Sequence, residues 1–441
     1  MSTPLYDALT AYARSNPARF HMPGHKGAPL SAPEFSALTP LDVTELPPTG
    51  NLYEAGAPFD EAQQLWARAF GFDHCQFLTG GSTLGIHTGL ALFTSPGDRV
   101  VVDRACHRSV YNAMALLDLE PVFLERPWLE EHNLIGPFSP ENVEKILDAH
   151  PDVKTVCITS PTYAGLLSDI PAISGEIHRR GGKLFVDGAH GAHLPVLGVD
   201  AFSGADGVVV SAHKTLPALG QGALLFYRGV EEDRVRRWAS VFGTSSPSYP
   251  IMASLDLCRD WLEGEGKEEY RRVRDRVARL RERFPSLGGE LPLDPTRLTL
   301  KVKDGPAFAR ALEERGIYPE MEDGGHVVLI CTGSDSEDSF VRLERALEEL
   351  EGEMGDCPPI PAPPLPRRVL SPRQALFAPT VSRPLEECEG QVAAGQLAPY
   401  PPGVPVVAPG EVISKKELSY FQQIGYNNKN VPLVDREIPL P

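Results

Sequence analysis

Short runs of β-forming residues alternate with helix-forming stretches between residues 73 and 227, and this alternation limits the fold more than any other feature of the chain. Such alternation is typical of βαβ units, whose parallel strands form a sheet covered by helices on both faces. We therefore predict an α/β fold with a mostly parallel seven-stranded sheet, whose ligands collect at the carboxyl ends of the strands. The expected strands are 75–79, 99–103, 121–124, 155–159, 183–187, 207–211 and 223–227, and the expected helices are 83–93, 109–117, 140–150 and 172–180.

Both flanks of this region differ from it in pattern. Residues 2–15 predict an amphipathic helix capped by Ser2 or Thr3, and a polar arm broken by Pro and Gly follows it. Beyond Pro250, helices at 267–284, 306–315 and 337–350 and strands at 298–302 and 326–331 predict a small α+β domain. The predicted organisation is an N-terminal helix and arm (1–50), a large domain (51–250), the small domain (251–355), a Pro-rich linker (356–370) and a C-terminal segment (371–441).

Composition excludes several classes of protein. A net charge of −17 argues against a nucleic-acid partner, because phosphate binding is driven by clustered Lys and Arg. No apolar run approaches the ~18 residues of a membrane helix, and the first twenty residues lack the apolar segment of a signal peptide. The seven cysteines form no CxxC pair, which favours reduced thiols in a cytoplasm.

Three chemically different groups follow predicted strands of the large domain. Lys214 comes after the apolar run 207–211, and Asp187 ends the run 183–187. The turn Gly80-Gly-Ser-Thr83 precedes a helix, whose first backbone N–H groups can bind a phosphate. Together they suit pyridoxal phosphate (PLP), which needs a lysine for its aldehyde, an acid for its pyridine nitrogen and an anion site for its phosphate.

Each group alone is weak evidence. A single lysine after a strand is in most proteins a surface residue. The glycine turn matches neither GxxxxGK[ST] nor GxGxxG, so it indicates no nucleotide-binding loop. The combination favours PLP.

From Arg19 to about Glu411 the sequence resembles the fold-type-I PLP-dependent ornithine/lysine/arginine decarboxylases, in their short form without a receiver-like N-terminal domain. Many ordered motifs carry the resemblance. They are Phe20-His-Met-Pro-Gly-His-Lys26, Asp42-Val-Thr-Glu45, Phe77-Leu-Thr-Gly-Gly-Ser-Thr83, Arg104-Ala-Cys-His-Arg-Ser109, Ser160-Pro-Thr-Tyr163, Asp187-Gly-Ala-His-Gly-Ala-His193, Ser211-Ala-His-Lys214, Thr244-Ser-Ser-Pro-Ser-Tyr249 and Tyr400-Pro-Pro-Gly with Pro409-Gly-Glu411.

The resemblance implies three catalytic residues. Lys214 forms the Schiff base with PLP, Asp187 pairs with the pyridinium nitrogen, and His107 stacks on one ring face and helps the proton steps. It also implies the other cofactor-binding residues, which are Gly81, Ser82, Thr83, Ala189 on the second ring face, His190, Ser211, His213 and Thr244. In this family a threonine of the partner subunit reaches the phosphate, and Thr244 matches it. A homodimer or higher homo-oligomer with shared active sites follows.

The sequence departs from the family at several positions. Gly188 replaces the usual Glu of Asp-Glu-Ala-His, Gly80 stands where Asn is common, and Pro217, Gly220 and Gly222 replace small polar or alanine residues after the lysine. None removes a group with a direct chemical role. We expect no metal site, since no carboxylate or Cys completes a ligand set with His190 and His193.

The expected reaction is PLP-dependent α-decarboxylation of a basic L-amino acid, giving CO₂ and an amine for polyamine biosynthesis. We expect arginine, because short-form members often resemble arginine decarboxylases, with lysine or ornithine as alternatives. Glu411 is the candidate for binding the substrate's cationic group, and the alternative is a solvated loop carboxylate. Two other functions remain open. One is an aminotransferase or lyase of the same fold, for which Arg297 lies near the place where an aminotransferase has a carboxylate-binding arginine. The other is a non-catalytic regulatory relative.

Overall fold

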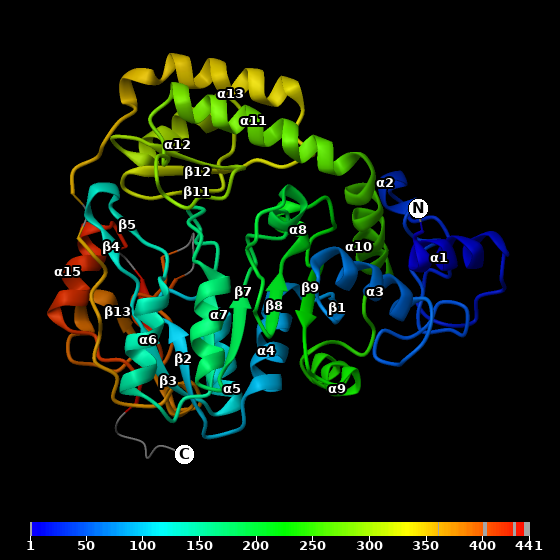
Figure 1. The fold of residues 1–441 in the computed structure, drawn as a ribbon, viewed down its shortest axis with the longest axis horizontal. Helices are drawn as coiled ribbons and strands as arrows, with labels where there is room; N and C mark the ends of the chain where they lie inside the picture. Colours follow the sequence, from blue (N-terminus) through cyan, green and yellow to red (C-terminus); the bar gives the residue numbers. More distant parts are fainter. Residues whose placement is uncertain (1, 360, 400–403, 427–428, 436–441) are drawn as a thin grey trace. The chain divides into compact units, whose positions relative to one another are not determined.

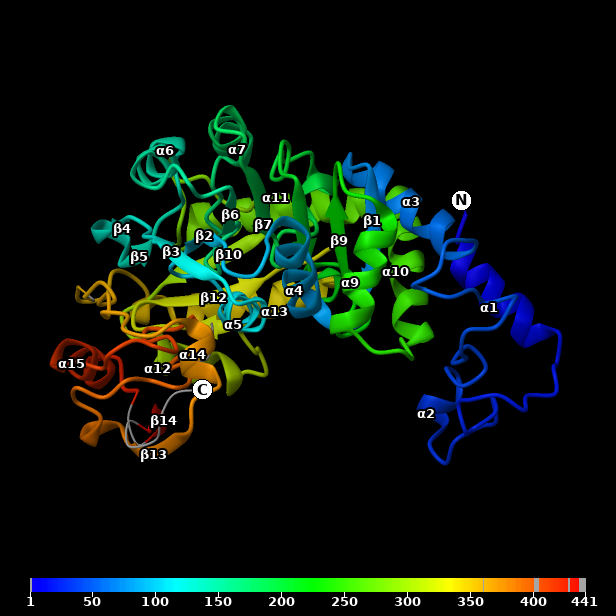
Figure 2. The same ribbon diagram turned by 90° about the horizontal axis from the view of Figure 1, so that it is seen from below.

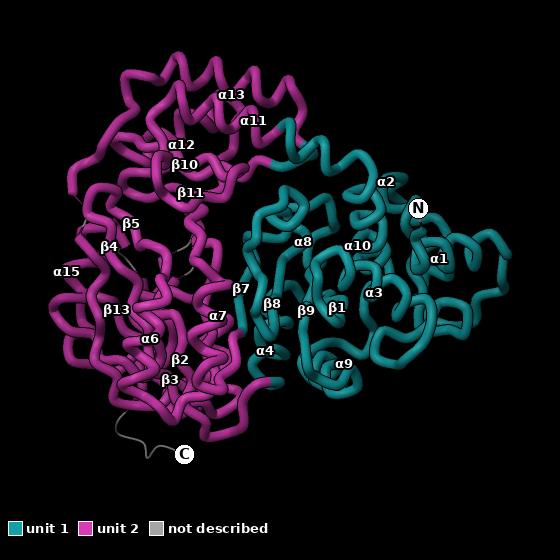
Figure 3. Tube along the Cα trace, viewed as in Figure 1, with its two compact units in different colours: residues 1–92, 185–272, 332–334 teal, residues 93–184, 273–331, 335–441 magenta. Residues whose placement is uncertain are grey.

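The computed structural model describes residues 2–359, 361–399, 404–426 and 429–435 (Figure 1). The Tyr400-Pro-Pro-Gly motif, residues 400–403, therefore lies outside the described residues. The chain forms two compact units, each assembled from separate segments (Figure 3). Unit 1 contains residues 1–92, 185–272 and 332–334, and unit 2 contains residues 93–184, 273–331 and 335–441. The five-part division along the sequence stays a prediction.

The strands confirm an α/β fold with a mostly parallel seven-stranded sheet, in the order β1-β9-β8-β7-β6-β2-β3. The pairs β7–β8, β2–β6 and β2–β3 are parallel, whereas β9 is antiparallel to both β1 and β8. All seven strands were expected from the sequence, four of them with the bounds they have. The bounds are β1 (His74–Leu78), β2 (Arg99–Asp103), β3 (Glu120–Leu124), β6 (Thr155–Thr159), β7 (Lys183–Asp187), β8 (Gly207–Val210) and β9 (Ala223–Tyr227).

In unit 1, helix α4 packs closely on the strands because two of its residues are glycine. A Cβ on Gly85 would lie 2.3 Å from Val209 Cγ2, and one on Gly89 would lie 2.2 Å from the Phe185 ring. This contact fixes where the first turn of α4 meets the carboxyl ends of β7 and β8. The unit's helices are α1 (Pro4–Arg14), α2 (Pro33–Ser36), α3 (Phe59–Phe70), α4 (Gly81–Phe93), α8 (Ala212–Thr215), α9 (Glu232–Phe242), α10 (Tyr249–Trp261) and the start of α11 (Lys267–Arg283).

The first helix, α1, forms as expected, but the expected cap is wrong. Thr3 occupies the N-cap position, and its side chain makes no capping hydrogen bond. Instead, Asp256 of α10 accepts the backbone N–H groups of Leu5 at 2.9 Å and Tyr6 at 3.2 Å. A carboxylate there satisfies free N–H groups and opposes the positive end of the helix dipole, so a distant side chain caps α1.

Unit 2 contains strands β6, β2 and β3 and a smaller α+β part. The latter contains the three-stranded antiparallel sheet β10-β12-β11 together with α11, α12 and α13, as the sequence predicts (Figure 1). Buried side chains of β10, β12 and these helices form one core. The elements are β4 (Trp128–Leu129), β5 (Leu134–Ile135), β10 (Arg297–Lys301), β11 (Met321–Glu322), β12 (His326–Ile330), α5 (Arg108–Leu117), α6 (Pro140–Ala149), α7 (Ile170–Arg179), α12 (Gly305–Glu313) and α13 (Glu337–Glu349).

The C-terminal segment of unit 2 has cores of its own. Helix α15 (Lys415–Gln423) and the β13–β14 ribbon (Thr380–Pro384 and Asn430–Val434) share one cluster, and α14 (Pro372–Leu376) belongs to a second (Figure 2). Arg368 and Glu411 form an isolated antiparallel bridge there. Within the described part of the chain, no helix is both long and apolar enough to cross a membrane.

Candidate active site

Lys214 lies just beyond the carboxyl end of β8. The strand ends at Val210, and Lys214 is the third residue of the short helix α8 rather than the end of the strand itself. Its Nζ atom lies 3.0 Å from Nε2 of His190, which follows β7. The structure thus brings together two of the predicted site residues.

Asp187 is the last residue of β7 and is buried. Its Oδ1 atom accepts the backbone N–H of Ala189 at 3.1 Å, which fixes the carboxylate at the strand end. Gly188, which replaces the usual Glu, has a packing reason, because a Cβ would lie 2.8 Å from the Phe202 ring. The departure therefore accommodates Phe202 and leaves Asp187 in place.

The glycine turn connects β1 to α4. Gly81 has φ +68°, in the left-handed region that favours glycine, and its N–H donates to Gln221 O at 2.9 Å. A cavity of about 270 Å³ opens beside the turn, and Thr244 of the same chain lines it. The lining residues are Thr79, Gly80, Thr83, Leu84, His87, Phe242, Gly243 and Thr244.

Two further predicted residues precede Lys214. Both the backbone N–H and Nδ1 of His213 lie about 3 Å from Gly222 O, at 3.1 and 3.0 Å. The Oγ atom of Ser211 is buried and has no hydrogen-bond partner in the described structure. Because a buried hydroxyl without a partner is costly, this atom indicates a polar group still to be bound.

The residues of unit 1 fit PLP on these observations. Ser211 offers a buried hydroxyl without a protein partner in the described structure. The 13-residue helix α4 begins at Gly81, and the N–H groups that follow Gly81 in its first turn attract a phosphate. Lys214 supplies an amine and Asp187 a buried carboxylate in the same unit. Two predicted residues, His107 and Glu411, belong to unit 2.

His107 is the N-cap residue of α5 in unit 2. Its Nδ1 atom lies 2.8 Å from Ser109 Oγ and accepts the Ser109 N–H at 3.3 Å. The Nδ1 side of the imidazole is therefore held by its own helix.

Glu411 is not a solvated loop carboxylate. It is 1% exposed, and its Oε2 atom accepts the Ala408 N–H at 2.7 Å and pairs with Arg104 Nη2 at 2.9 Å. Burial raises the pKa of Glu411 above its usual value, and the nearby Arg104 guanidinium partly opposes that rise. The alternative of an exposed carboxylate is wrong because Arg104 compensates a buried charge.

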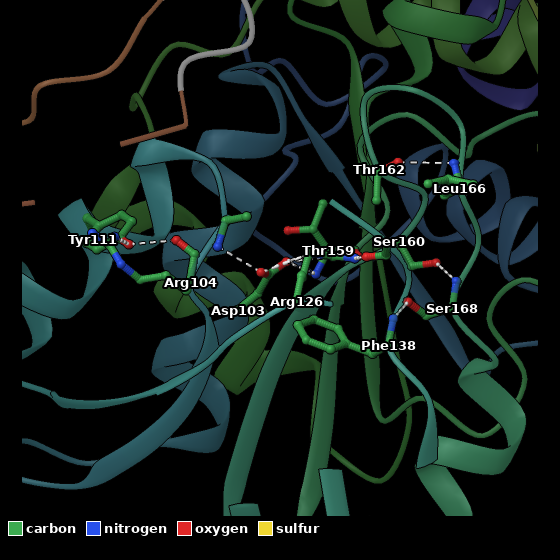
Figure 4. A network of polar contacts seen from close by, with 12 residues as sticks. Asp103, Arg104, Tyr111, Arg126, Phe138, Thr159, Ser160, Thr162, Leu166 and Ser168 are labelled. Atoms are coloured by element: carbon green, nitrogen blue, oxygen red, sulfur yellow. Dashed lines mark hydrogen bonds and ion pairs between the residues drawn. The ribbon is translucent and has the colours of Figure 1, made fainter. Parts of the chain in front are cut away.

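Sequence reasoning missed a polar network at the carboxyl ends of β2 and β6 (Figure 4). Asp103 pairs with Arg126 at 2.6 Å, both buried, and Arg126 also donates to Thr159 O at 2.5 Å. Arg126 stacks over the ring of Phe138 at 4.3 Å. One sequence signal could have indicated this network. Asp103 and Arg104 are two charged residues at the end of an apolar run, shortly before His107.

Comparison with known proteins gives a family match over most of the chain. Residues 3–297 match the family model described as "Orn/Lys/Arg decarboxylase, major domain", and residues 364–439 match "Orn/Lys/Arg decarboxylase, C-terminal domain". The arginine decarboxylase of Bacillus subtilis (strain 168) is 32% identical, with 95% of this chain and 93% of that protein covered. The constitutive lysine decarboxylase of Escherichia coli (strain K12) is 25% identical, with 94% and 76% covered.

A solved structure shows the same fold. The crystal structure of the lysine decarboxylase LdcF of Francisella novicida superposes with a TM-score of 0.81 at 20% identity. The match covers 98% of this chain and 81% of that chain. The predicted fold class is thereby confirmed over almost the whole length.

Proposed function

Because the chain belongs to the Orn/Lys/Arg decarboxylase family, and is therefore a PLP-dependent decarboxylase of basic amino acids, we propose that its substrate is L-arginine. The relative named arginine decarboxylase is 32% identical to the chain, and the one named lysine decarboxylase is 25% identical. That difference supports arginine over lysine. The amine product would enter polyamine biosynthesis in the cytoplasm.

One observation carries the proposed PLP chemistry, which is the position of Lys214 in unit 1 beyond the end of β8, 3.0 Å from His190. We propose that Lys214 binds the PLP aldehyde and that the residues around the Gly80–Gly81 turn hold its phosphate. Ser82, Thr83 and the buried Ser211 hydroxyl supply its hydrogen bonds, and Gly81, whose N–H is bound to Gln221 O, borders the group. His213, held against Gly222 O, would border the same group.

Bound PLP supplies an electron sink for the electron pair of the Cα–carboxylate bond as CO₂ leaves. Asp187 keeps a proton on the pyridine nitrogen, since its buried carboxylate stabilises that charge. Ala189, whose N–H binds Asp187, offers a small side chain beside the ring. Lys214 exchanges protons with the substrate amine, and His190 holds the lysine amine in reach.

Two roles rest on motif matches. We propose that His107 stacks on the ring and takes part in proton transfer, with its Nδ1 side held by Ser109. The substrate-binding role predicted for Glu411 would require its carboxylate to accept a second cation beside Arg104. That role stays a prediction.

We also propose a homodimer with shared active sites, in which Thr244 reaches the phosphate of the partner. In its own chain Thr244 lines the cavity beside Gly80 and Thr83, which is the competing position for its hydroxyl. No observation favours an aminotransferase, because Arg297 is 1% exposed in unit 2, with its Nε 3.7 Å from Asp294.

The test is CO₂ and amine production by the purified, PLP-loaded protein with arginine, lysine and ornithine offered separately. We expect kcat/KM for arginine to exceed that for lysine by at least about 10-fold, and Lys214→Ala to abolish turnover and the absorbance of bound PLP. A preference for lysine or ornithine would contradict the arginine assignment alone. Turnover of none, with a PLP absorbance band that needs Lys214, would reject the decarboxylase and favour 2-oxo acid acceptors.

A further inference from the structure

Asp103 ends strand β2, and Arg104 directly follows it. Their side chains pair with different parts of unit 2. Asp103 faces Arg126, whereas Arg104 faces Tyr111 of α5 and the C-terminal segment (Figure 4). Both are buried, and both lie within four residues of His107. The loop that carries His107 therefore begins between two buried ion pairs.

Arg104 connects this loop to the C-terminal segment. Its Nη2 atom donates to Val406 O at 2.9 Å and pairs with Glu411 Oε2 at 2.9 Å. Its carbonyl accepts the Tyr111 hydroxyl at 2.9 Å, and its N–H donates to Leu124 O at 2.9 Å. The backbone of Arg104 is thus held by Leu124 and Tyr111, and its side chain is held by the C-terminal segment.

Glu411 lies in a turn whose backbone conformation is fixed by a glycine and by hydrogen bonds. Gly410 has φ +89°, and a Cβ there would lie 2.4 Å from Leu370 O, so only glycine fits. The Gly410 N–H donates to Ala393 O at 2.8 Å, and the Glu411 carboxylate accepts the Ala408 N–H. The turn holds the carboxylate where Arg104 meets it.

The residues between Arg104 and His107 are fixed as well. The Ala105 N–H donates to Asp103 Oδ1 at 2.8 Å, and the Cys106 N–H donates to Asp103 O at 3.1 Å. Hence every backbone N–H from 104 to 106 has a partner, and His107 follows at once as the N-cap of α5. A displacement of Arg104 would be transmitted to His107 along three constrained residues.

We propose that Arg104 and Glu411 are positioning residues, whose buried ion pair fixes the loop 103–107, and with it the His107 imidazole, to the turn 409–411. Stability alone explains such a pair poorly, because a buried ion pair is often matched by apolar residues of similar volume. The ion pair is better explained by its geometry, because it holds the loop 103–107 in one position relative to the turn 409–411. The catalytic role of His107 rests on the proposed function. Its positioning by Arg104 and Glu411 does not, because all three residues belong to unit 2.

The test is a double-mutant cycle between Glu411→Gln and His107→Ala in the PLP-loaded enzyme. Glu411→Gln keeps the shape and an acceptor for Ala408 but removes the charge that Arg104 meets. We expect it to lower kcat on the order of 10-fold while KM changes less than about 3-fold, and to cost less than about 3-fold once His107 is absent. An equal loss in both backgrounds would overturn the proposal.

A second readout does not depend on the reaction. The imidazole NMR signals of His107, identified by their disappearance in His107→Ala, should shift in Glu411→Gln and in Arg104→Gln. They should not shift in Arg99→Gln, which breaks the exposed pair with Asp152 at the other end of β2 (2.8 Å). Unchanged signals in both test variants would overturn the positioning role.

The two readouts also separate this proposal from the proposed function. If the wild-type enzyme decarboxylates no basic amino acid, the proposed function fails and the NMR comparison still decides the positioning role. If Glu411→Gln does not fold, Arg104→Gln takes its place in the cycle with the same expected result.

Discussion

The Nζ atom of Lys214 and the Nε2 atom of His190 lie 3.0 Å apart, although the two residues follow different strands of the sheet. An ammonium group has three donors and no acceptor, so a charged Lys214 requires a neutral imidazole that accepts at Nε2. His190 therefore orients the amine on which the proposed reaction depends.

We expect His190→Ala to lower kcat about 10-fold, because the amine loses the group that orients it and general acid–base steps depend on geometry. Steady-state kinetics with arginine measure the effect. His150→Ala, which removes an imidazole that contacts Arg99 on the surface, serves as the control and should leave kcat unchanged. Equal rates for wild type and His190→Ala would exclude the orienting role.

Ser211→Ala should change PLP affinity and apoprotein stability in opposite directions. The hydroxyl is buried without a partner, so its removal should leave the thermal midpoint of the apoprotein equal or higher. The dissociation constant for PLP should rise about 10-fold or more, since hydrogen bonds to charged groups contribute roughly 1.5–3 kcal/mol.

Ser254→Ala is the matched control for that comparison. The Ser254 hydroxyl accepts the Leu219 N–H at 3.0 Å and donates to Ile251 O at 2.7 Å, so its loss should destabilise the apoprotein. PLP affinity should stay the same. A Ser211→Ala apoprotein destabilised as much as Ser254→Ala would refute the assignment of an unsatisfied hydroxyl.

The cap of α1 should depend on pH. Burial raises the pKa of Asp256 to about 6 from 3.8, against the two backbone N–H donors and Arg259, which lower it. Between these values the folded state holds a proton that the unfolded state has released. The contribution of Asp256 to the free energy of unfolding therefore falls as pH rises from about 4 to 6, by at most about 1.4 kcal/mol per pH unit.

The comparison that checks this is urea unfolding of wild type and Asp256→Asn between pH 4.5 and 7. Asparagine does not titrate, so the wild type should lose stability relative to the variant as pH rises, and the difference should become constant above about pH 7. A difference that is independent of pH over this range would show that Asp256 keeps an ordinary pKa.

Shared active sites predict complementation between two inactive or impaired variants. In a mixed dimer of Lys214→Ala and Thr244→Val chains, one site would combine an intact Lys214 with the intact Thr244 of its partner. Activity after mixing should then exceed the sum of the separate homodimers, approaching half the wild-type value per mixed dimer. Absence of any gain would assign Thr244 to the cavity of its own chain, beside Gly80.

Sequence reasoning predicted the helices and strands whose apolar residues recur with a clear period. The strands Arg99–Asp103 and Thr155–Thr159 have the bounds expected, because their apolar runs are flanked by charged or small polar residues. Helices α9 and α10 and the hairpin β4–β5 were not predicted. In α9 the sequence Glu-Asp-Arg-Val-Arg-Arg offers charges on most faces, and only Val235, Arg236 and Ala239 are buried.

Candidate site residues could be chosen from the sequence where chemistry dictates the residue type, whereas their packing partners could not. Lys214 and the glycine turn each follow a strand whose end the sequence marks, and Asp187 is the last residue of such a strand. The contacts of Glu411 were not predictable, since Arg104 is 307 residues away along the chain. A side chain's partner depends on tertiary contacts that no local pattern encodes, and the Asp256 cap of α1 was missed for the same reason.

That cap also has a consequence for the order of events during synthesis. Leu5 and its acceptor Asp256 are 251 residues apart, so α1 leaves the ribosome long before α10 exists. At about 5–20 residues per second, the interval is on the order of 10–50 s. During that time the 11-residue helix lacks its carboxylate, and isolated helices of this length are marginal in water. Helix α1 is therefore expected to become permanently helical only after Asp256 has been made.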